Sequence, residues 1–341
     1  MVHALLRSLL APWWAAQLLT GAKSFVDNPL LGSGRLNRRG LHAWRVALAH
    51  RMAGQRRERL ARHLAPADRA DFDRDGFVAW RDFLPPAAFA QLRDQILDFR
   101  GPAREMVQGD TITRRYAIDP AALRLIPAAH IFINDPRWRA MSRYVASFDI
   151  EPLLYIQSIL THRHDAPPDP QVHLHADTFH PTMKAWLFLE DVDASAGPLT
   201  YVAGSHRLTP ERLAWEQGRS IDVLDRGDRL SARGSLRIER DELAGLGLPE
   251  PTAFAVPANT LVIADTFGFH ARGMTAERST RIELWAYSRR NPFLPFTGLD
   301  AWSLPGIAER RIPLLWKTHD IYRRLIGQPW AAVGRKRPGD D

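Results

Sequence analysis

The sequence contains no cysteine among its 341 residues. This absence excludes disulfide bonds, zinc sites and iron–sulfur clusters held by cysteine thiolates, and a thiol nucleophile. Any metal ion bound by side chains must therefore use histidine and carboxylate ligands. The absence does not by itself define the cellular compartment.

Long apolar runs and internal repeats are also missing. No stretch of 18 or more uninterrupted apolar residues occurs, so the sequence predicts no membrane-spanning helix. Residues 5–20 are apolar but are interrupted by Arg7, Pro12 and Gln17. The 45% hydrophobic and 25% charged residues are typical of a globular protein. We expect a cytoplasmic protein, with peripheral membrane contact as the alternative.

Positive charge is concentrated at the N-terminus. Residues 1–65 contain eleven lysines or arginines and only Asp27 and Glu58 as acids, in a chain of net charge +8. A basic segment on a near-neutral body favours anionic partners such as nucleic acid or an acidic membrane surface. For the body itself we expect no nucleic-acid partner.

Two helical patterns are predicted within this basic extension. The first has an apolar stripe that either packs on the body or lies on a membrane, formed by Leu5, Leu6, Leu9, Leu10, Trp13 and Trp14. The second covers residues 41–64 and places an apolar stripe opposite its arginines; the stripe comprises Leu41, Trp44, Leu48 and Met52. Its arginines are expected to face solvent or anionic lipid.

Residues 171–207 contain the densest group of candidate ligands. His175 and Asp177 are two residues apart, so on an extended backbone their side chains point to the same face. A second histidine from a distant strand would complete the facial triad of non-haem Fe(II) oxygenases, and His270 is suitably placed. His173 and His180 lie nearby, but only His175 completes the His-x-Asp spacing.

The motifs that follow in the chain give this pair its context. They are the apolar strand 185–189, the turn Gly197-Pro198-Leu199, the sequence Gly204-Ser205-His206, then His270 and, eleven residues later, Arg281. From residue 72 to residue 287 this succession, with Asp-Arg-Asp-Gly-Phe-Val at 73–78, resembles the phytanoyl-CoA dioxygenase-like family of Fe(II)/2-oxoglutarate enzymes. We expect an all-β core with peripheral helices, a double-stranded β-helix or cupin-like jelly-roll barrel.

The resemblance also implies the cofactors and their ligands. It predicts Fe(II) held by His175, Asp177 and His270, with 2-oxoglutarate as cosubstrate and O₂ as oxidant, and Trp186 lining the 2-oxoglutarate pocket. The cosubstrate's distal carboxylate needs a two-pronged cation, for which we choose Arg281. Arg272 and Arg278 are competitors, and the family often carries serine at the position of Arg272.

Further pocket residues are predicted from strand faces. Gln157 lies in the β-rich segment 153–161 and is expected to face the cavity. Lys184 shares a strand face with Trp186 and points either toward an anion or to solvent. Arg114 and Arg115 are read as surface arginines rather than substrate contacts.

The reaction expected from these residues is hydroxylation of a C–H bond in a lipid, an acyl-CoA or a secondary metabolite, with release of succinate and CO₂. Related halogenases replace the carboxylate with a small residue, so Asp177 favours hydroxylation. One alternative is a cupin-like binding protein without turnover. A zinc hydrolase built on two histidines and an aspartate is a further alternative, but the His-Glu-x-x-His motif is absent.

We divide the chain into three parts. Residues 1–65 form the N-terminal extension, residues 66–295 the oxygenase domain, and residues 296–341 a C-terminal helical segment and tail. An irregular insertion at 207–257 is expected to contribute the substrate-binding loops or a lid. The basic tail 335–338 is expected to be disordered.

Overall fold

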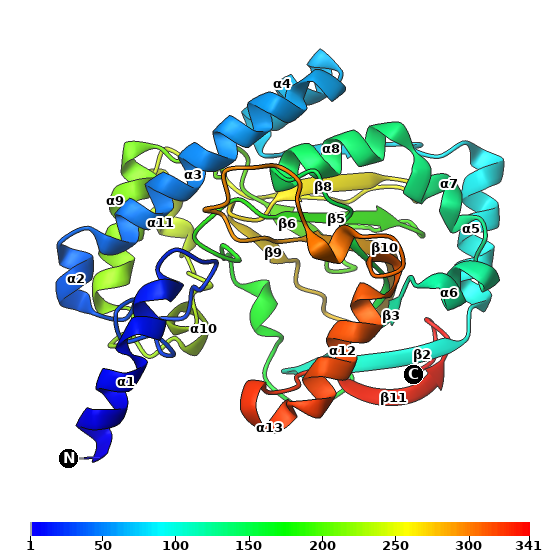
Figure 1. Ribbon diagram of the computed structural model, residues 1–341. Coiled ribbons are helices and arrows are strands. Elements are labelled where there is room, and N and C mark those ends of the chain that lie inside the picture. The colour runs from blue at the N-terminus through cyan, green and yellow to red at the C-terminus, as the bar shows by residue number, and fades with distance from the viewer. Residues whose placement is uncertain (1) are drawn as a thin grey trace.

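The computed structural model describes residues 2–341, excluding the side chains of residues 2–9, 325 and 326. A large antiparallel sheet forms its centre (Figure 1). In the described chain its eight strands follow the order β1 (Phe77–Trp80), β8 (Leu261–Asp265), β5 (Met183–Phe188), β10 (Thr280–Ser288), β4 (Leu153–Leu160), β3 (Thr111–Ala117), β2 (Gly101–Gln108) and β11 (Ala331–Lys336).

A smaller sheet packs against the large one. Its strands are β7 (Thr252–Ala253), β6 (Leu199–Tyr201) and β9 (His270–Arg272). Trp186 and Trp285 of the large sheet share a buried aromatic layer with Leu199 and Tyr201 of the small one. The Tyr201 hydroxyl donates a 2.7 Å hydrogen bond to the carbonyl oxygen of Asp265. Two antiparallel sheets packed in this way, with helices outside, confirm the predicted double-stranded β-helix class.

Strand alternation separates the helix side of the large sheet from the site side. On β10, Ile282, Leu284 and Ala286 join the core beneath the helices. Glu283 and Trp285 point to the opposite face and line a cavity. The helices that cover the first face or flank it are α5 (Pro86–Asp98), α6 (Pro120–Leu125), α7 (Ala129–Asn134) and α8 (Pro136–Ala146).

The N-terminal part contains α1 (Val2–Gln17), α2 (Gly34–Arg38), α3 (Leu41–Leu60), the short 3-10 helix Ala61–His63 and α4 (Pro66–Asp75). The predicted apolar stripe of α3 is wrong, because Trp44 is 49% exposed whereas Arg45 and Arg56 are buried. Arg56 donates to the carbonyl oxygens of Ser147, Pro292 and Leu294. A buried guanidinium is stabilised when its donors meet such acceptors. The prediction that the arginines of this segment face solvent or lipid is therefore wrong for Arg45 and Arg56, whereas Arg51, Arg59 and Arg62 are exposed.

Part of the N-terminal stripe predicted for α1 rests on Leu5, Leu6 and Leu9, whose side chains lie outside the described residues. Trp13 is 61% exposed. A search of the described helices finds none that is long and apolar enough to cross a membrane.

The insertion does not form the predicted substrate loops. It contains α9 (Pro210–Asp222), α10 (Arg229–Ala232) and α11 (Arg240–Gly245), and α9 packs on α2 and α3. Among the described residues, none from 207 to 257 lines the large cavity beside the site. The C-terminal segment contains α12 (Arg311–Ile321) and α13 (Arg323–Ile326). Several of its residues between 315 and 330 line the cavity instead.

The C-terminal tail is ordered, contrary to the prediction. Strand β11 pairs with β2 at the edge of the large sheet. Arg114 is fully buried beneath the tail, where it pairs with Glu105 at 2.6 Å and donates to the carbonyl oxygen of Asp340. Ser158 donates to the carbonyl oxygen of Pro338 (2.8 Å). These contacts give the basic tail fixed partners, which the local sequence does not reveal.

His206 of the Gly-Ser-His turn packs in the core beneath α4. A Cβ at Gly76, which has φ +84°, would lie 2.4 Å from the His206 ring, so this close approach requires glycine. Burial lowers the pKa of His206 to about 3, and the charges of Arg57 and Arg207 add to this effect. The folded protein therefore keeps this imidazole neutral.

We expect this buried histidine to make the fold acid-sensitive. In the unfolded chain His206 would bind a proton near pH 6.5, whereas in the folded protein it would do so only near pH 3. Its contribution to the free energy of unfolding is therefore fully present above pH 6.5 and is lost as the pH falls toward 3. Between pH 6 and 4 the free energy of unfolding should fall by about 1.4 kcal/mol per pH unit for this group. When the free energy of unfolding of His206→Gln is measured with urea at several pH values, its decrease per pH unit should be smaller than that of wild type by this amount. The matched variant of exposed His63, His63→Gln, should retain the wild-type slope, and identical slopes in all three proteins would contradict the assignment.

Candidate metal centre and its cavity

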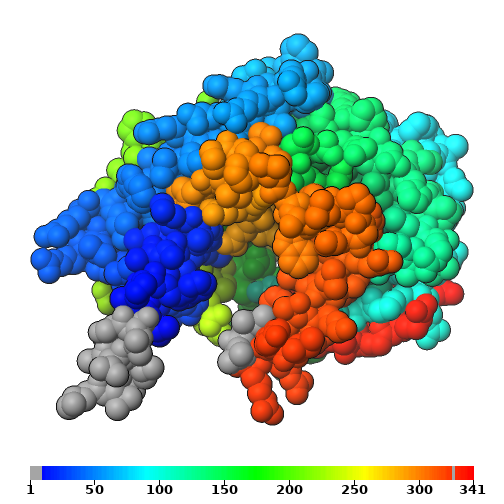
Figure 2. Space-filling view, in the orientation of Figure 1, coloured from blue at the N-terminus to red at the C-terminus, as the bar shows by residue number. Residues whose placement is uncertain are grey.

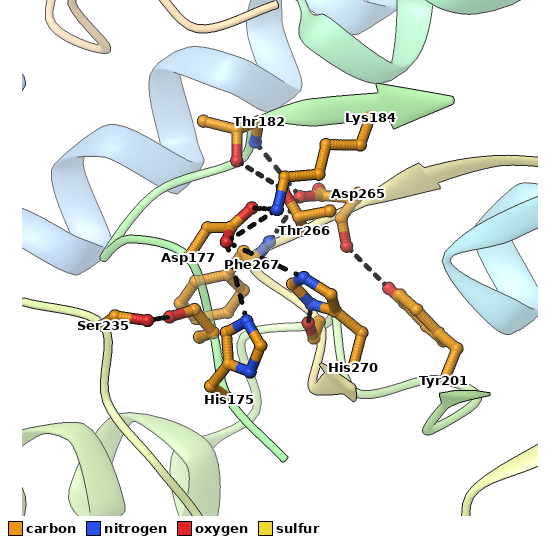
Figure 3. Close-up of polar contacts among 12 residues, drawn as sticks. His175, Asp177, Thr182, Lys184, Tyr201, Ser235, Asp265, Thr266, Phe267 and His270 are labelled. Carbon is orange, nitrogen blue, oxygen red and sulfur yellow. Dashed lines mark hydrogen bonds and ion pairs between the residues drawn. The ribbon is translucent and has the colours of Figure 1, made fainter. Parts of the chain in front are cut away.

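His175, Asp177 and His270 converge at one point between the two sheets (Figure 3). His175 and His270 lie on adjacent extended segments that exchange two backbone hydrogen bonds of 3.0 Å. The Nε2 atoms of His175 and His270 lie 3.8 Å and 3.7 Å from Oδ1 of Asp177, and all three ligand atoms lie within 4.8 Å of one another. Ligand atoms this close together can contact one metal ion.

The backbone orients both imidazoles. Nδ1 of His175 lies 2.8 Å from the carbonyl oxygen of His173, and Nδ1 of His270 lies 2.9 Å from that of Gly268. Because a carbonyl oxygen only accepts, each Nδ1 must carry the proton, and each Nε2 is left with its lone pair. Nε2 of His270 is buried and has no hydrogen-bond partner among the described residues. Such an arrangement is typical of a metal-binding histidine.

Electrostatics keep all three groups in the state that binds a cation. Burial lowers the pKa of His270 to about 4. Burial, followed by the charge of His270, lowers the pKa of His175 well below its usual range. Burial alone would raise the pKa of Asp177, but Lys184 and the two histidines outweigh it and hold this pKa below its usual range. The site therefore presents two neutral imidazoles and one carboxylate.

Lys184 points inward from β5, which answers one question left open by the sequence. Its Nζ lies 2.9 Å from Oδ1 and 2.6 Å from Oδ2 of Asp177. The two competing histidines do not join the cluster. His173 is exposed, and His180 is buried with its Nδ1 near the carbonyl oxygen of Pro181.

A cavity of about 670 Å³ opens beside the three ligands. Figure 2 shows a hollow between the dark-blue N-terminal segment and the orange C-terminal helices. Trp186, Arg281, Arg272 and Gln157 all line the cavity, as expected if they contact a ligand there. Arg278 does not line it; the side chain is 57% exposed and pairs with Asp341 on the surface.

Arg281 lies in a buried polar chain that crosses three strands. Its Nε pairs with Glu283 at 3.1 Å, and Gln157 donates to the other Glu283 oxygen at 2.7 Å. Arg115 donates to the amide oxygen of Gln157 at 2.7 Å and lies 3.7 Å above the Trp285 ring. Arg115 is therefore a cavity residue, not the surface arginine that was predicted. Arg272 pairs with Asp169, which lies outside the cavity lining.

Several cavity residues were missed by the sequence reasoning. Glu283, Trp285 and Tyr287 follow Arg281 at intervals of two on β10, so strand periodicity could have identified them. Lys23 also lines the cavity, although it precedes Asp177 by 154 residues. No local pattern connects a lysine of the N-terminal extension with the metal ligands.

Comparison with solved structures gives matches at low sequence identity. The epimerase SnoN from nogalamycin biosynthesis, described as α-ketoglutarate-dependent, is 21% identical over 68% of this chain and 82% of its own, with a TM-score of 0.42. HygX from Streptomyces hygroscopicus, solved with nickel and 2-oxoglutarate, is 18% identical over 66% of this chain and 86% of its own, with a TM-score of 0.43. A search of curated proteins gives no match.

The family comparison is the informative one. Residues 72–222 match the model of the phytanoyl-CoA dioxygenase (PhyH) family. The matched region contains His175, Asp177, Lys184 and Trp186, whereas His270 and Arg281 lie beyond it and join the site through β9 and β10. Residues 72–222, less than half of the chain, are therefore similar to the phytanoyl-CoA dioxygenase family, and the double-stranded β-helix fold agrees with this similarity.

Proposed function

We propose that this protein uses Fe(II), 2-oxoglutarate and O₂ to hydroxylate a C–H bond of a small organic substrate, with release of succinate and CO₂. The observation that carries the proposal is the convergence of His175, Asp177 and His270, whose free Nε2 and carboxylate atoms lie within 4.8 Å of one another. Two imidazoles and one carboxylate are the ligand set of the non-haem Fe(II) facial triad. Fe(II) bound there would supply open positions for a 2-oxo acid and for O₂.

The protein's own groups have separate roles in this proposal. His175, Asp177 and His270 would hold the metal, and Lys184 would keep the Asp177 carboxylate ionised and oriented. Arg281 would bind the distal carboxylate of 2-oxoglutarate, because its guanidinium faces the cavity at the start of β10. Trp186 and Gln157 would line the cosubstrate pocket, with Arg272 as the alternative cation.

Hydroxylation is favoured over halogenation because the carboxylate ligand, Asp177, is present. A binding protein without turnover would show the same ligands, so a kinetic measurement must distinguish the two. The family match disfavours the zinc hydrolase considered from sequence. The partners in this proposal are a small-molecule substrate and the cosubstrate, and no membrane partner is part of it.

Anaerobic addition of Fe(II) and 2-oxoglutarate should give the weak visible charge-transfer band of a metal-bound 2-oxo acid. Admission of O₂ should then release succinate, measured by chromatography. Zn(II) in place of Fe(II) should bind at the same ligands without succinate release. A band without succinate, in the presence of a broad set of lipids, CoA thioesters and small metabolites, would favour the binding protein. Absence of the band would contradict the proposal.

A further inference from the structure

The N-terminal segment reaches the cavity through the side chain of Lys23. Its Nζ donates a 2.5 Å hydrogen bond to the backbone carbonyl oxygen of Asp177 and lines the same cavity as the metal ligands. Burial lowers the pKa of Lys23 to about 8, with the charge of Arg289 as the second cause. The lysine therefore still carries a proton at neutral pH.

The backbone around Lys23 is held in place on both sides. Buried Arg45 donates to the carbonyl oxygens of Leu18 (2.9 Å), Thr20 (2.9 Å) and Ala22 (2.7 Å). Arg289, which follows β10, donates to that of Gly21 at 2.8 Å. A segment held by this many charge-assisted hydrogen bonds is a structural part of the cavity wall.

Positive charge exceeds negative charge in this cavity. Its lining contains the cations Lys23, Arg115, Lys184, Arg272, Arg281 and Arg289, against the carboxylates Asp177 and Glu283. Asp169 neutralises Arg272 from outside the lining. Ferrous iron and 2-oxoglutarate carry equal and opposite charges, so their binding would leave the excess unchanged. Unpaired cations in a partly enclosed cavity favour an anionic ligand.

Besides Arg115, which lies 3.7 Å above the ring of Trp285 within the strand, two of the cations lie at opposite ends of β10. Arg281 lies near its start, and Arg289 follows its last residue, Ser288. Eight residues of strand correspond to roughly 25 Å, so one small cosubstrate cannot engage both ends. At the second end, Lys23 and Arg289 donate to backbone carbonyls and, among the described residues, neither pairs with a carboxylate. The ion pair of Lys184 with Asp177 neutralises the third cation there.

An apolar wall connects the two ends. Trp285 and Tyr287 project from the same face of β10 and stack with ring centroids 5.7 Å apart at 9°. Trp186, on the neighbouring strand β5, lies directly beside Trp285 in the sheet register. All three line the cavity. A ligand that reaches Lys23 from the metal would therefore lie along aromatic surface.

We propose that Lys23 and Arg289 form a subsite for an anionic group, a carboxylate or a phosphate, on a substrate whose apolar body lies along Trp186, Trp285 and Tyr287. This inference rests on the proposed function, because it takes the Arg281 end of the cavity as the cosubstrate site. It makes the N-terminal extension a determinant of substrate specificity, through a residue that lies before the family-matched region.

The experiment compares three probes with the same chain: octanoate, octyl phosphate and octanol. Calorimetric titrations use anaerobic protein loaded with Fe(II) and saturating 2-oxoglutarate, and are repeated on unloaded protein. Wild type should bind at least one anion about tenfold or more tightly than octanol, since a charge-assisted hydrogen bond is worth about one factor of ten or more. Preference for octanoate or for octyl phosphate identifies the anionic group.

Variants test whether Lys23 and Arg289 carry this preference. Lys23→Met and Arg289→Gln should each reduce the preference for the anion by about tenfold, and Lys23→Arg should retain it. Lys317→Met removes an exposed lysine of α12 and should match wild type. Equal wild-type affinity for octanol and both anions would overturn the inference, as would an unchanged preference in both Lys23→Met and Arg289→Gln.

The failure of this inference can be told apart from failure of the proposed function. If Fe(II) and 2-oxoglutarate give no charge-transfer band, the oxygenase proposal fails, while the unloaded protein still reports the anion preference. If Lys23→Met does not fold, the comparison of probes in wild type and Arg289→Gln decides the result. Loss of the anion preference with an unchanged affinity for octanol would assign charge recognition, and not packing, to these two residues.

Discussion

Replacing Asp177 with alanine should abolish Fe(II)-dependent succinate release, by roughly a thousandfold or more, because the metal loses its anionic ligand. The two remaining imidazoles are neutral, so they offer no charge to balance the ferrous ion. Iron content after anaerobic gel filtration and succinate release under saturating 2-oxoglutarate are the measurements. Asp165→Ala removes an exposed carboxylate from a loop and should behave like wild type.

A second variant separates metal loss from structural damage. Asp177→Ala leaves Lys184 without its carboxylate partner in the cavity wall, which is itself destabilising. The double variant Asp177→Ala/Lys184→Met removes that unpaired charge and should regain stability without regaining iron. If Asp177→Ala retains iron and full succinate release, the assignment of this metal site is wrong.

Replacing Arg281 with alanine should raise the 2-oxoglutarate concentration needed for half-maximal succinate release by about a hundredfold. The change removes two charge-assisted hydrogen bonds to the distal carboxylate, each worth about 1.5 kcal/mol or more. The half-maximal concentration from the anaerobic charge-transfer band is an independent measure of cosubstrate affinity. Arg281→Lys should recover part of the loss, because it keeps the charge but not the planar fork.

The chain provides matched controls for this prediction. Arg278 lies three residues earlier on the surface, and Arg278→Ala should leave cosubstrate affinity unchanged. Arg281→Ala also leaves buried Glu283 with Gln157 as its remaining partner, so Arg281→Ala/Glu283→Gln tests whether that unpaired carboxylate contributes. A larger effect from Arg272→Ala than from Arg281→Ala would move the cosubstrate role to Arg272.

Much of the site follows from strand periodicity. The two-residue spacing places His175 and Asp177 on one face of an extended segment. The same rule orders Arg281, Glu283, Trp285 and Tyr287 along β10, although only Arg281 was named. Such predictions succeed because an alternating backbone dictates side-chain direction without any knowledge of distant contacts.

The errors have a different physical origin. Arginines on α3 were expected to face solvent or lipid, yet Arg45 and Arg56 are buried. Their donors are satisfied by carbonyl groups from distant loops, and helical periodicity contains no information about those loops. The insertion at 207–257 was expected to shape the cavity, but it packs beside α2 and α3, and the C-terminal segment lines the cavity instead.

The sequence alone determined that metal chemistry must use histidine and carboxylate ligands, since cysteine is absent, and it determined the local His-x-Asp pair. It also contained the succession of motifs that resembles the phytanoyl-CoA dioxygenase-like family. Only the tertiary structure decided that Lys23 enters the cavity, that Arg115 faces it and that Arg278 does not. Those outcomes depend on which backbone carbonyls and sheet faces meet after folding, and no local spacing in the chain encodes such encounters.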